Sequence, residues 1–314
     1  MRQIFAARKM GSTDLDNSRH PFALLALGVF GISLSAIFVR YSQAPSGVTA
    51  SWRLLWTSLL LSPALLASRS CRHELRTIPP RLLLLCAVSG LALALHFVTW
   101  FESLALTSVA SSTVIVCTEV VWVALGWFLL RRGRLRAKEA CAVAAALLGS
   151  FLVARADLSG GGASGLRGDL LSLFSAIVLA CHTLLGSEAR KSLSTMTYTW
   201  IIYLFCTAAL LLNTLLRGES LTGYGMSPVI AGVLLAFFST LLGHSIFSRC
   251  LKFFSPTFVS ATRLCEPVVA TILAALLFRE VPSAGSLWGG LLVIGGVLAY
   301  SRAEKERISG EGEV

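Results

Sequence analysis

The stretch "ATRLCEPVVATILAALLF", Ala261–Phe278, places an arginine, a glutamate and a proline in the middle of an apolar run. An apolar helix of roughly 17–25 residues crosses ~30 Å of hydrocarbon. A charge at the centre of such a helix is unfavourable unless it faces protein or water. Arg263 and Glu266 are therefore candidate functional residues, and Pro267 marks a break in the helix.

The composition of the whole chain agrees with a membrane setting. Hydrophobic residues make up 55% of the 314 residues and charged residues 14%, whereas soluble domains carry about 25% charged residues. The net charge of +11 would suggest nucleic acid if it formed a patch on a soluble domain. Here the basic residues stand in short segments between apolar runs, so we expect a lipid bilayer and no nucleic acid as partner.

Apolar runs of spanning length predict an all-α integral membrane protein with ten transmembrane helices. The runs are Phe22–Arg40, Gly47–Leu66, Arg81–Phe101, Thr107–Leu130, Glu139–Ala154, Gly168–Gly186, Met196–Leu216, Pro228–Phe247, Ser255–Phe278 and Ala284–Tyr300. The predicted organisation is an N-terminal tail (1–20), a first repeat of five helices (21–156), a Gly/Ser linker (157–167), a second repeat of five helices (168–301) and a C-terminal tail (302–314).

The distribution of lysine and arginine predicts the orientation. Most of the 27 basic residues fall in the segments that would share a side with the N-terminus, and such segments are cytoplasmic by the positive-inside rule. Both termini are thus expected in the cytoplasm. The first twenty residues are polar and show no cleavable signal. The eight cysteines lie in predicted helices or inner segments, where they read as packing residues, and no Cys/His spacing suggests a metal site.

An internal repeat relates the two halves. "TEVVWVALGWFLLRRG" aligned with "CEPVVATILAALLFRE" places Glu119 on Glu266, and the same shift places Ser108 on Ser255 and Gly149 on Gly296. Five helices is an odd number, so the second copy must enter the membrane inverted. Inverted repeats are typical of secondary transporters, whose substrate site lies near the midplane between the repeats.

Two stretches, "HFVTWFESLALTSVASSTVIV" and "LGHSIFSRCLKFFSPTFVSATRLCEPVVATILAALLFRE", resemble the EamA branch of the drug/metabolite transporter superfamily. The resemblance covers the whole chain. It implies a ten-helix carrier of the bacterial inner membrane, with a central cavity lined by helices 1, 3, 4, 6, 8 and 9. It guides the choice of substrate only weakly. The chain departs from the usual pattern at Glu119 and Arg263, and both departures add charge to the expected cavity.

The depth of the charges supports this placement. At ~1.5 Å per residue, Glu119 and Glu266 lie about 18 Å and 16 Å from the starts of their predicted helices, near the middle of the membrane. The face of Glu119 continues as Ser112 and Trp122, a polar stripe unsuited to lipid. A structural ion pair between Arg263 and Glu266, which are three residues apart, is the alternative interpretation.

Weaker candidates complete the expected substrate site. Arg53 lies about 9 Å into its helix, where it either binds substrate or extends to the outer surface. His96 and Trp100 stand one helical turn apart, and His244 lies near the matching place in the second repeat. A lone buried histidine is more often a packing residue than a proton carrier. Because Pro267 has no backbone N–H, the carbonyl of Arg263 lacks its helical hydrogen-bond donor. This indicates a gate, a binding notch or a packed kink.

The hypothesis that follows is a secondary transporter of a small polar, zwitterionic metabolite that works by alternating access as a proton-coupled carrier or an exchanger. Glu119 and Glu266 are the candidate proton carriers, and Glu119 is favoured unless an arginine of another helix reaches it. Export of cationic drugs is the alternative. An intramembrane enzyme is less favoured because the sequence has none of the motifs of hydrolases or nucleotide-binding enzymes. No cofactor is expected, and the protein is a monomer or a homodimer.

Overall fold

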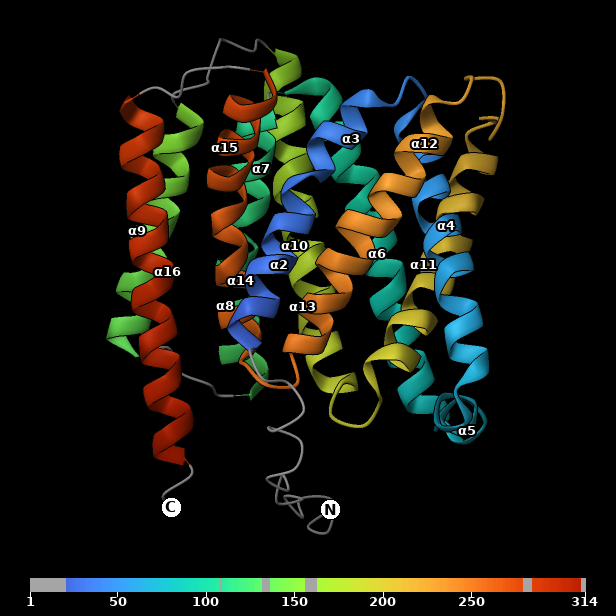
Figure 1. Ribbon diagram of the computed structural model, residues 1–314, viewed down its shortest axis with the longest axis horizontal. Coiled ribbons are helices and arrows are strands. Elements are labelled where there is room, and N and C mark those ends of the chain that lie inside the picture. The colour runs from blue at the N-terminus through green and yellow to red at the C-terminus, as the bar shows by residue number, and fades with distance from the viewer. Residues whose placement is uncertain (1–20, 108, 132–135, 156–162, 279–283, 312–314) are drawn as a thin grey trace.

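The protein is a bundle of helices (Figure 1). The computed structural model describes residues 21–107, 109–131, 136–155, 163–278 and 284–311, and every regular element within them is helical. In chain order these are α2 (Pro21–Ser33), α3 (Ser35–Tyr41), α4 (Ser46–Ala67), α5 (Arg69–Thr77), α6 (Pro80–Leu106), α7 (Val109–Cys117), α8 (Glu119–Arg131), α9 (Ala137–Arg155), α10 (Ala163–Ala189), α11 (Thr195–Leu216), α12 (Ser227–Leu234), η1 (Leu235–His244), α13 (Ser245–Cys250), α14 (Pro256–Thr262), η2 (Arg263–Cys265), α15 (Glu266–Phe278) and α16 (Ala284–Glu311).

Six helical segments in the described part of the chain are long and apolar enough to cross a membrane. They are Pro21–Tyr41, Pro80–Leu106, Ser111–Leu129, Gly165–Ala189, Thr195–Leu216 and Ser227–Cys250. The count rises to 7 if α4 and α5, which meet at 100°, form one span, and α16 contains the shorter apolar helix Leu287–Ala303. The protein is thus a multi-pass membrane protein.

Two boundaries differ from the sequence expectation. Helix α10 begins at Ala163, inside the expected linker, so that residues 163–167 form the start of the helix that holds the apolar run. Helix α16 continues to Glu311, through most of the expected C-terminal tail, because Ala, Glu, Lys and Arg in "SRAEKERISGE" are good helix formers. The expected N-terminal tail and residues 156–162 lie outside the described residues.

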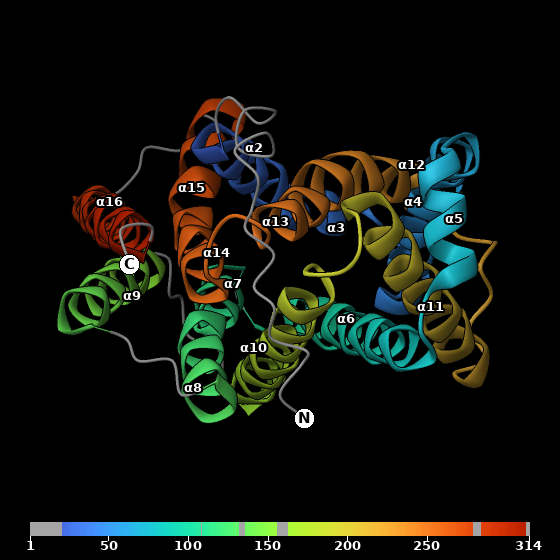
Figure 2. The ribbon, with the colours of Figure 1, turned by 90° about the horizontal axis from the view of Figure 1, so that it is seen from below.

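The helices form one elongated bundle with distinct edges. Helices α9 and α16 pair at one edge, and α4 packs against α11 near the other (Figures 1 and 2). Between the edges lie α2, α6 and α10 together with the segments in which the helix is interrupted. The start of α2 and the end of α16 lie at the same end of the bundle, as does α5 (Figure 1).

Three interruptions lie in the middle of the bundle. Helix α7 ends at Cys117 and α8 begins at Glu119, so that Thr118 separates them. Helices α14 and α15 are joined by the 3₁₀ turn η2. Pro267 is the second residue of α15, and its missing N–H prevents a regular α-helical bond to the carbonyl of Arg263. The segment from α12 to α13 contains the π-helix η1, and π-helical segments are frequent at functional sites.

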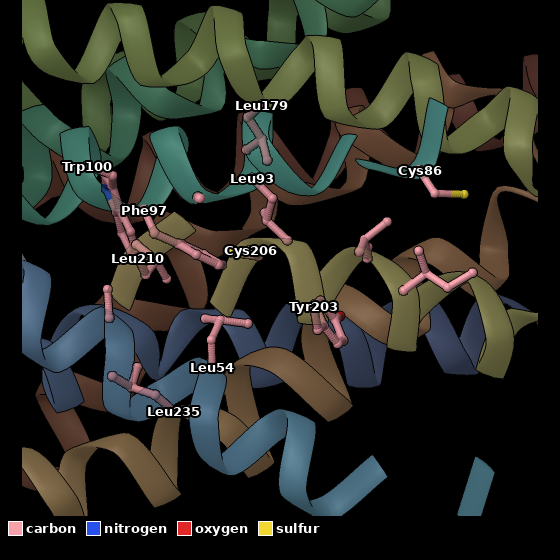
Figure 3. Close-up of a cluster of buried hydrophobic side chains, with 14 of the residues drawn as sticks. Leu54, Cys86, Leu93, Phe97, Trp100, Leu179, Tyr203, Cys206, Leu210 and Leu235 are labelled. Atoms are coloured by element: carbon pink, nitrogen blue, oxygen red, sulfur yellow. The ribbon is translucent and has the colours of Figure 1, made fainter. Parts of the chain in front are cut away.

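Two buried hydrophobic clusters hold the bundle together. One gathers side chains of α4, α6, α10, α11 and η1, including Leu54, Phe97 and Leu210. Figure 3 shows Phe97 and Trp100 reaching from α6 toward the side chains of α4 and α11. The other cluster gathers side chains of α2, α7, α8, α9, α13, α14, η2, α15 and α16. The interrupted helices contribute side chains to both clusters, so polar groups at the interruptions lie next to apolar packing.

Candidate functional site

A small buried pocket lies where the interrupted helices meet. Its lining comes from six of the predicted transmembrane helices: Ile32 and Ser35; His96 and Trp100; Thr113, Val116, Cys117 and Glu119; Leu179; His244; and Arg263 and Glu266. These are helices 1, 3, 4, 6, 8 and 9, the set that the sequence resemblance implies. Measured as the space open to the centre of a water molecule, the pocket is about 30 Å³, which is room for about two waters. A metabolite therefore enters only if the lining moves.

Glu119 is the most fully partnered charge in the pocket. Its Oε2 accepts a hydrogen bond from Arg263 Nη1 at 3.2 Å, which is also an ion pair between the two halves of the chain. Its Oε1 accepts from the hydroxyls of Thr183 at 2.6 Å and Ser260 at 3.3 Å. The sequence favoured Glu119 as the proton carrier unless an arginine of another helix reached it, and Arg263 does reach it.

Glu266 is placed differently, although it matches Glu119 in the repeat. Its carboxylate forms no ion pair and no side-chain hydrogen bond with the described residues. The i, i+3 pair with Arg263 considered from sequence is therefore not formed, because the Arg263 guanidinium is directed to Glu119. Both glutamates are the first residue of a helix that follows an interruption, where the helix dipole favours a negative charge.

The backbone carbonyls exposed by the η2 turn are satisfied by side chains from three other helices. The Cys117 thiol donates to the carbonyl of Arg263 at 3.6 Å, and the Ser150 hydroxyl donates to that of Leu264 at 3.3 Å. The Ser33 hydroxyl contacts the carbonyl of Glu266 at 3.4 Å. In a membrane, carbonyls without a helical partner need a hydrogen-bond donor from a neighbouring side chain, and these three side chains supply the donors at the kink before Pro267.

An aromatic and imidazole wall closes one side of the pocket. The rings of His96 and Trp100 stack with centroids 6.0 Å apart and an interplanar angle of 9°, and His244 lies 6.4 Å from His96. His96 Nδ1 bonds the Ser175 hydroxyl at 2.7 Å. The Trp100 Nε1 and His244 Nδ1 atoms are buried and have no hydrogen-bond partner among the described residues, so both can bond a molecule in the pocket.

The interface of α6 and α10 repeats the His–Ser pairing in reverse order. His96 of α6 bonds Ser175 of α10, while His182 of α10 bonds Ser89 of α6 at 2.9 Å. The Ser89 hydroxyl also lies 3.1 Å from the hydroxyl of Tyr198. These reciprocal bonds fix the two helices side by side, and they give His182 a packing role outside the pocket.

Arg53 is fully buried beside the pocket rather than extended to the outer surface. Its Nε donates to the Thr240 hydroxyl in η1 at 2.8 Å, and its guanidinium carbon lies 4.1 Å from the centroid of the Phe97 ring. The Nη1 and Nη2 atoms have no partner among the described residues. The side chain is 0% exposed, so extension to the surface does not occur.

The remaining predicted residues separate into two groups. Glu119, Arg263, Glu266, His96, Trp100 and His244 all line the pocket. Ser112 and Trp122 do not: the Ser112 hydroxyl bonds Ser103 at 2.6 Å and Ser172 at 3.1 Å instead, and Trp122 is half-buried.

Sequence reasoning did not assign Thr183, Cys117 or Ser35 to the site, although Thr183 contacts Glu119 and the other two line the pocket. Small polar residues are common in membrane helices, so no local signal marks these three. In the described part of the chain, no group of three His, Cys, Asp or Glu side chains could hold a metal ion.

The comparison with known families decides the class of protein. The EamA-like transporter family matches the sequence twice, over residues 20–155 and 166–302. The chain belongs to the EamA-like transporter family. Each match covers one half of the chain, as expected for two EamA repeats, and the pocket lies between the two matched halves.

Two similar proteins share a low sequence identity with this chain. The chain is 20% identical over 229 residues to an uncharacterized transporter of Clostridium kluyveri, covering 71% of this chain and 73% of the relative. It is 27% identical over 201 residues to a probable amino-acid metabolite efflux pump of Salmonella typhimurium, covering 60% and 66%. A solved crystal structure, 17% identical with a TM-score of 0.73, covers 91% of this chain and 98% of its own and supports the fold.

Proposed function

We propose that this EamA-like protein is a secondary transporter of a small polar, zwitterionic metabolite, with an amino acid as the type of substrate. The observation that carries the proposal is the buried Arg263–Glu119 pair between the two halves, beside a second carboxylate, Glu266, that forms no ion pair with the residues that the structure describes. A pocket with both signs of charge can bind both ends of a zwitterion. The name of the Salmonella relative, a probable amino-acid metabolite efflux pump, supports this substrate class.

The architecture that goes with this function is ten transmembrane helices in two inverted repeats. Helix α9, the interrupted pair α14–α15 and helix α16 then complete the spans, although each is shorter or less apolar than the clear ones. The matching interruptions before Glu119 and Glu266 support inverted repeats. We place the protein in the bacterial inner membrane with both termini in the cytoplasm, on the basis of the lysine and arginine distribution.

Alternating access is the mechanism that suits this pocket. With room for about two waters, it is too small to hold a metabolite in this state. The interruptions at Thr118 and η2 are places where the two parts of a helix can change their angle without breaking regular bonds. Rocking of one repeat against the other about these points would open the pocket to one side of the membrane at a time.

Glu266 is the proton carrier in this proposal. Glu119 already accepts hydrogen bonds from an arginine and two hydroxyl groups. Glu266 lines the pocket without such donors among the described residues, so a proton can bind its carboxylate without breaking an ion pair. Binding and release of a proton at Glu266 would therefore change the net charge of the pocket, whereas Glu119 keeps the two repeats paired.

A counterflow assay tests the substrate class. Purified protein is reconstituted in liposomes loaded with one unlabelled compound, and entry of the labelled compound is measured for amino acids, carboxylic acids and quaternary amines. Accumulation of a zwitterionic amino acid is the expected result. Counterflow of quaternary amines alone would instead support the cationic-drug exporter, which the Glu266 carboxylate and the His96–Trp100 stack favour. Counterflow of no compound would contradict both.

A further inference from the structure

Arg53 carries a buried charge that the pocket as described does not use. The side chain is 0% exposed, and only its Nε has a hydrogen-bond partner, Thr240. The Nη1 and Nη2 atoms, which form the fork of the guanidinium, have none among the described residues. A buried charge without a partner is strongly unfavourable, so this fork is expected to meet an anion at some stage of the protein's cycle.

The ring of Phe97 stands between Arg53 and the pocket. The Arg53 guanidinium carbon is 4.1 Å from the centroid of this ring. The Phe97 ring also contacts the pocket residues His244, at 5.4 Å between centroids, and His96, at 5.2 Å. The charge of Arg53 also interacts electrostatically with Glu266 and with both histidines. Arg53 therefore lies one aromatic ring beyond the pocket wall.

The Phe97 ring divides Arg53 from the pocket, so it would have to move for a molecule in the pocket to reach Arg53. Figure 3 shows the ring extending from α6 into the cluster that also holds Leu54, the neighbour of Arg53 in α4. The Thr240 hydroxyl that holds Arg53 belongs to the π-helix η1, as does His244. A shift of η1 or a rotation of Phe97 would therefore join the space beside Arg53 to the pocket.

The charges near the pocket form a balanced set of four. Arg263 and Glu119 neutralise each other directly. Glu266 and Arg53 are of opposite sign and are not in contact, and neither forms an ion pair with the described residues. A molecule with an ammonium group at one end and a carboxylate at the other would satisfy both. Arg263 is less available to a substrate, because its Nη1 already donates to Glu119.

We propose that Arg53 forms a carboxylate subsite behind Phe97, and that a zwitterionic substrate bridges Arg53 through its carboxylate and Glu266 through its ammonium group. This rests on the proposed function and deepens it, because it assigns the carboxylate to Arg53 rather than to Arg263. The planar fork of an arginine matches a carboxylate in a bidentate way. Recognition would then require that Phe97 move aside when the substrate enters.

Matched probes separate the two ends of the substrate. Binding to the full chain in nanodiscs is measured for L-leucine, for 3-methylbutylamine, which lacks the carboxylate, and for 4-methylpentanoate, which lacks the amine, with L-phenylalanine, phenethylamine and 3-phenylpropanoate as a second set. We expect Arg53→Met to weaken amino-acid and carboxylate binding by about 10- to 100-fold and to leave amine binding within about twofold. Arg217→Met, at the surface-exposed pair with Glu102, is the control and should change none of them.

Two further variants decide the matter if Arg53→Met does not fold. Thr240→Val keeps the shape but removes the acceptor that positions the guanidinium, and should weaken binding of the carboxylate-bearing probes alone. Phe97→Leu replaces the dividing ring by a smaller side chain and should strengthen binding of the same carboxylate-bearing probes. Equal effects on amino acid and amine, or no effect on either, would overturn the subsite. Failure of wild-type protein to bind any probe of either set would instead overturn the proposed function, and the subsite with it.

Discussion

Arg263 and Glu119 join the two repeats through an ion pair of 3.2 Å, with the arginine 9% and the glutamate 2% exposed at the side chain. The pair is long-range in sequence and central in space. The pair determines which groups of the pocket remain available to a substrate, because it binds Arg263, a cation of the pocket lining, to a residue of the opposite repeat.

The first prediction concerns the stability of the pair itself. Removing one partner of a buried pair leaves an uncompensated charge and costs about 3–5 kcal/mol. We therefore expect Arg263→Met and Glu119→Gln each to lower the thermal unfolding midpoint in detergent, with Arg263→Met the larger effect, and the double variant to recover part of the loss. The exposed pair of Glu188 and Lys191, at 3.0 Å, supplies the control: Glu188→Gln should cost less than about 1 kcal/mol. Additive effects of the two substitutions would show that the groups are not coupled.

The second prediction concerns coupling to protons. Glu266→Gln carries a permanently neutral side chain, which is also a weaker partner for an ammonium group. The variant should therefore keep counterflow only at a raised substrate concentration and lose accumulation driven by a pH gradient in liposomes. Glu119→Gln, the matched substitution in the other repeat, should keep the dependence of accumulation on the pH gradient at a lower rate. If Glu266→Gln still accumulates substrate with the wild-type pH dependence, the proton is carried elsewhere.

The third prediction concerns the kink before Pro267. Pro267→Ala restores an N–H that can bond the carbonyl of Arg263, now contacted by Cys117, and should favour a straight helix. We expect the turnover rate to fall about tenfold if motion at η2 limits transport, with an unfolding midpoint equal to or above that of the wild type. Pro63, inside α4, is the control, and Pro63→Ala should leave turnover unchanged. A Pro267→Ala variant with wild-type turnover would show that η2 is not a hinge.

The fourth prediction uses a native cysteine as a reporter of access. Cys117 lines the pocket and is 4% exposed, so a thiol reagent reaches it only when the pocket opens. A methanethiosulfonate reagent should inhibit transport, more slowly when saturating substrate is present. Cys117→Ser retains a donor for the Arg263 carbonyl and should be active and resistant. Inhibition of Cys117→Ser at the wild-type rate would assign the effect to another cysteine, and labelling from both sides at once would indicate a channel.

Much of this molecule can be predicted from the sequence because the bilayer imposes simple rules on it. The apolar runs predict helices, and six of them meet the criterion for spanning in the described residues. The shared glutamates predict the repeat, which the two family matches support. The charges that line the pocket were predicted because a charge in the middle of a membrane helix needs a reason. The interruption at Pro267 was predicted from the loss of one backbone N–H.

Only the tertiary structure decided which of these charges meet. Spacing along the chain favoured Arg263 with Glu266, since i, i+3 neighbours share a face of a regular α-helix. The η2 turn replaces 3.6 residues per turn by 3.0, and packing against α8 and α10 brings Glu119 and Thr183 together with Arg263 and Ser260. Arg53 was likewise buried by its contact with η1 and Phe97. Such contacts depend on distances between helices that no local pattern encodes, whereas membrane insertion and helix formation depend on the composition of each segment.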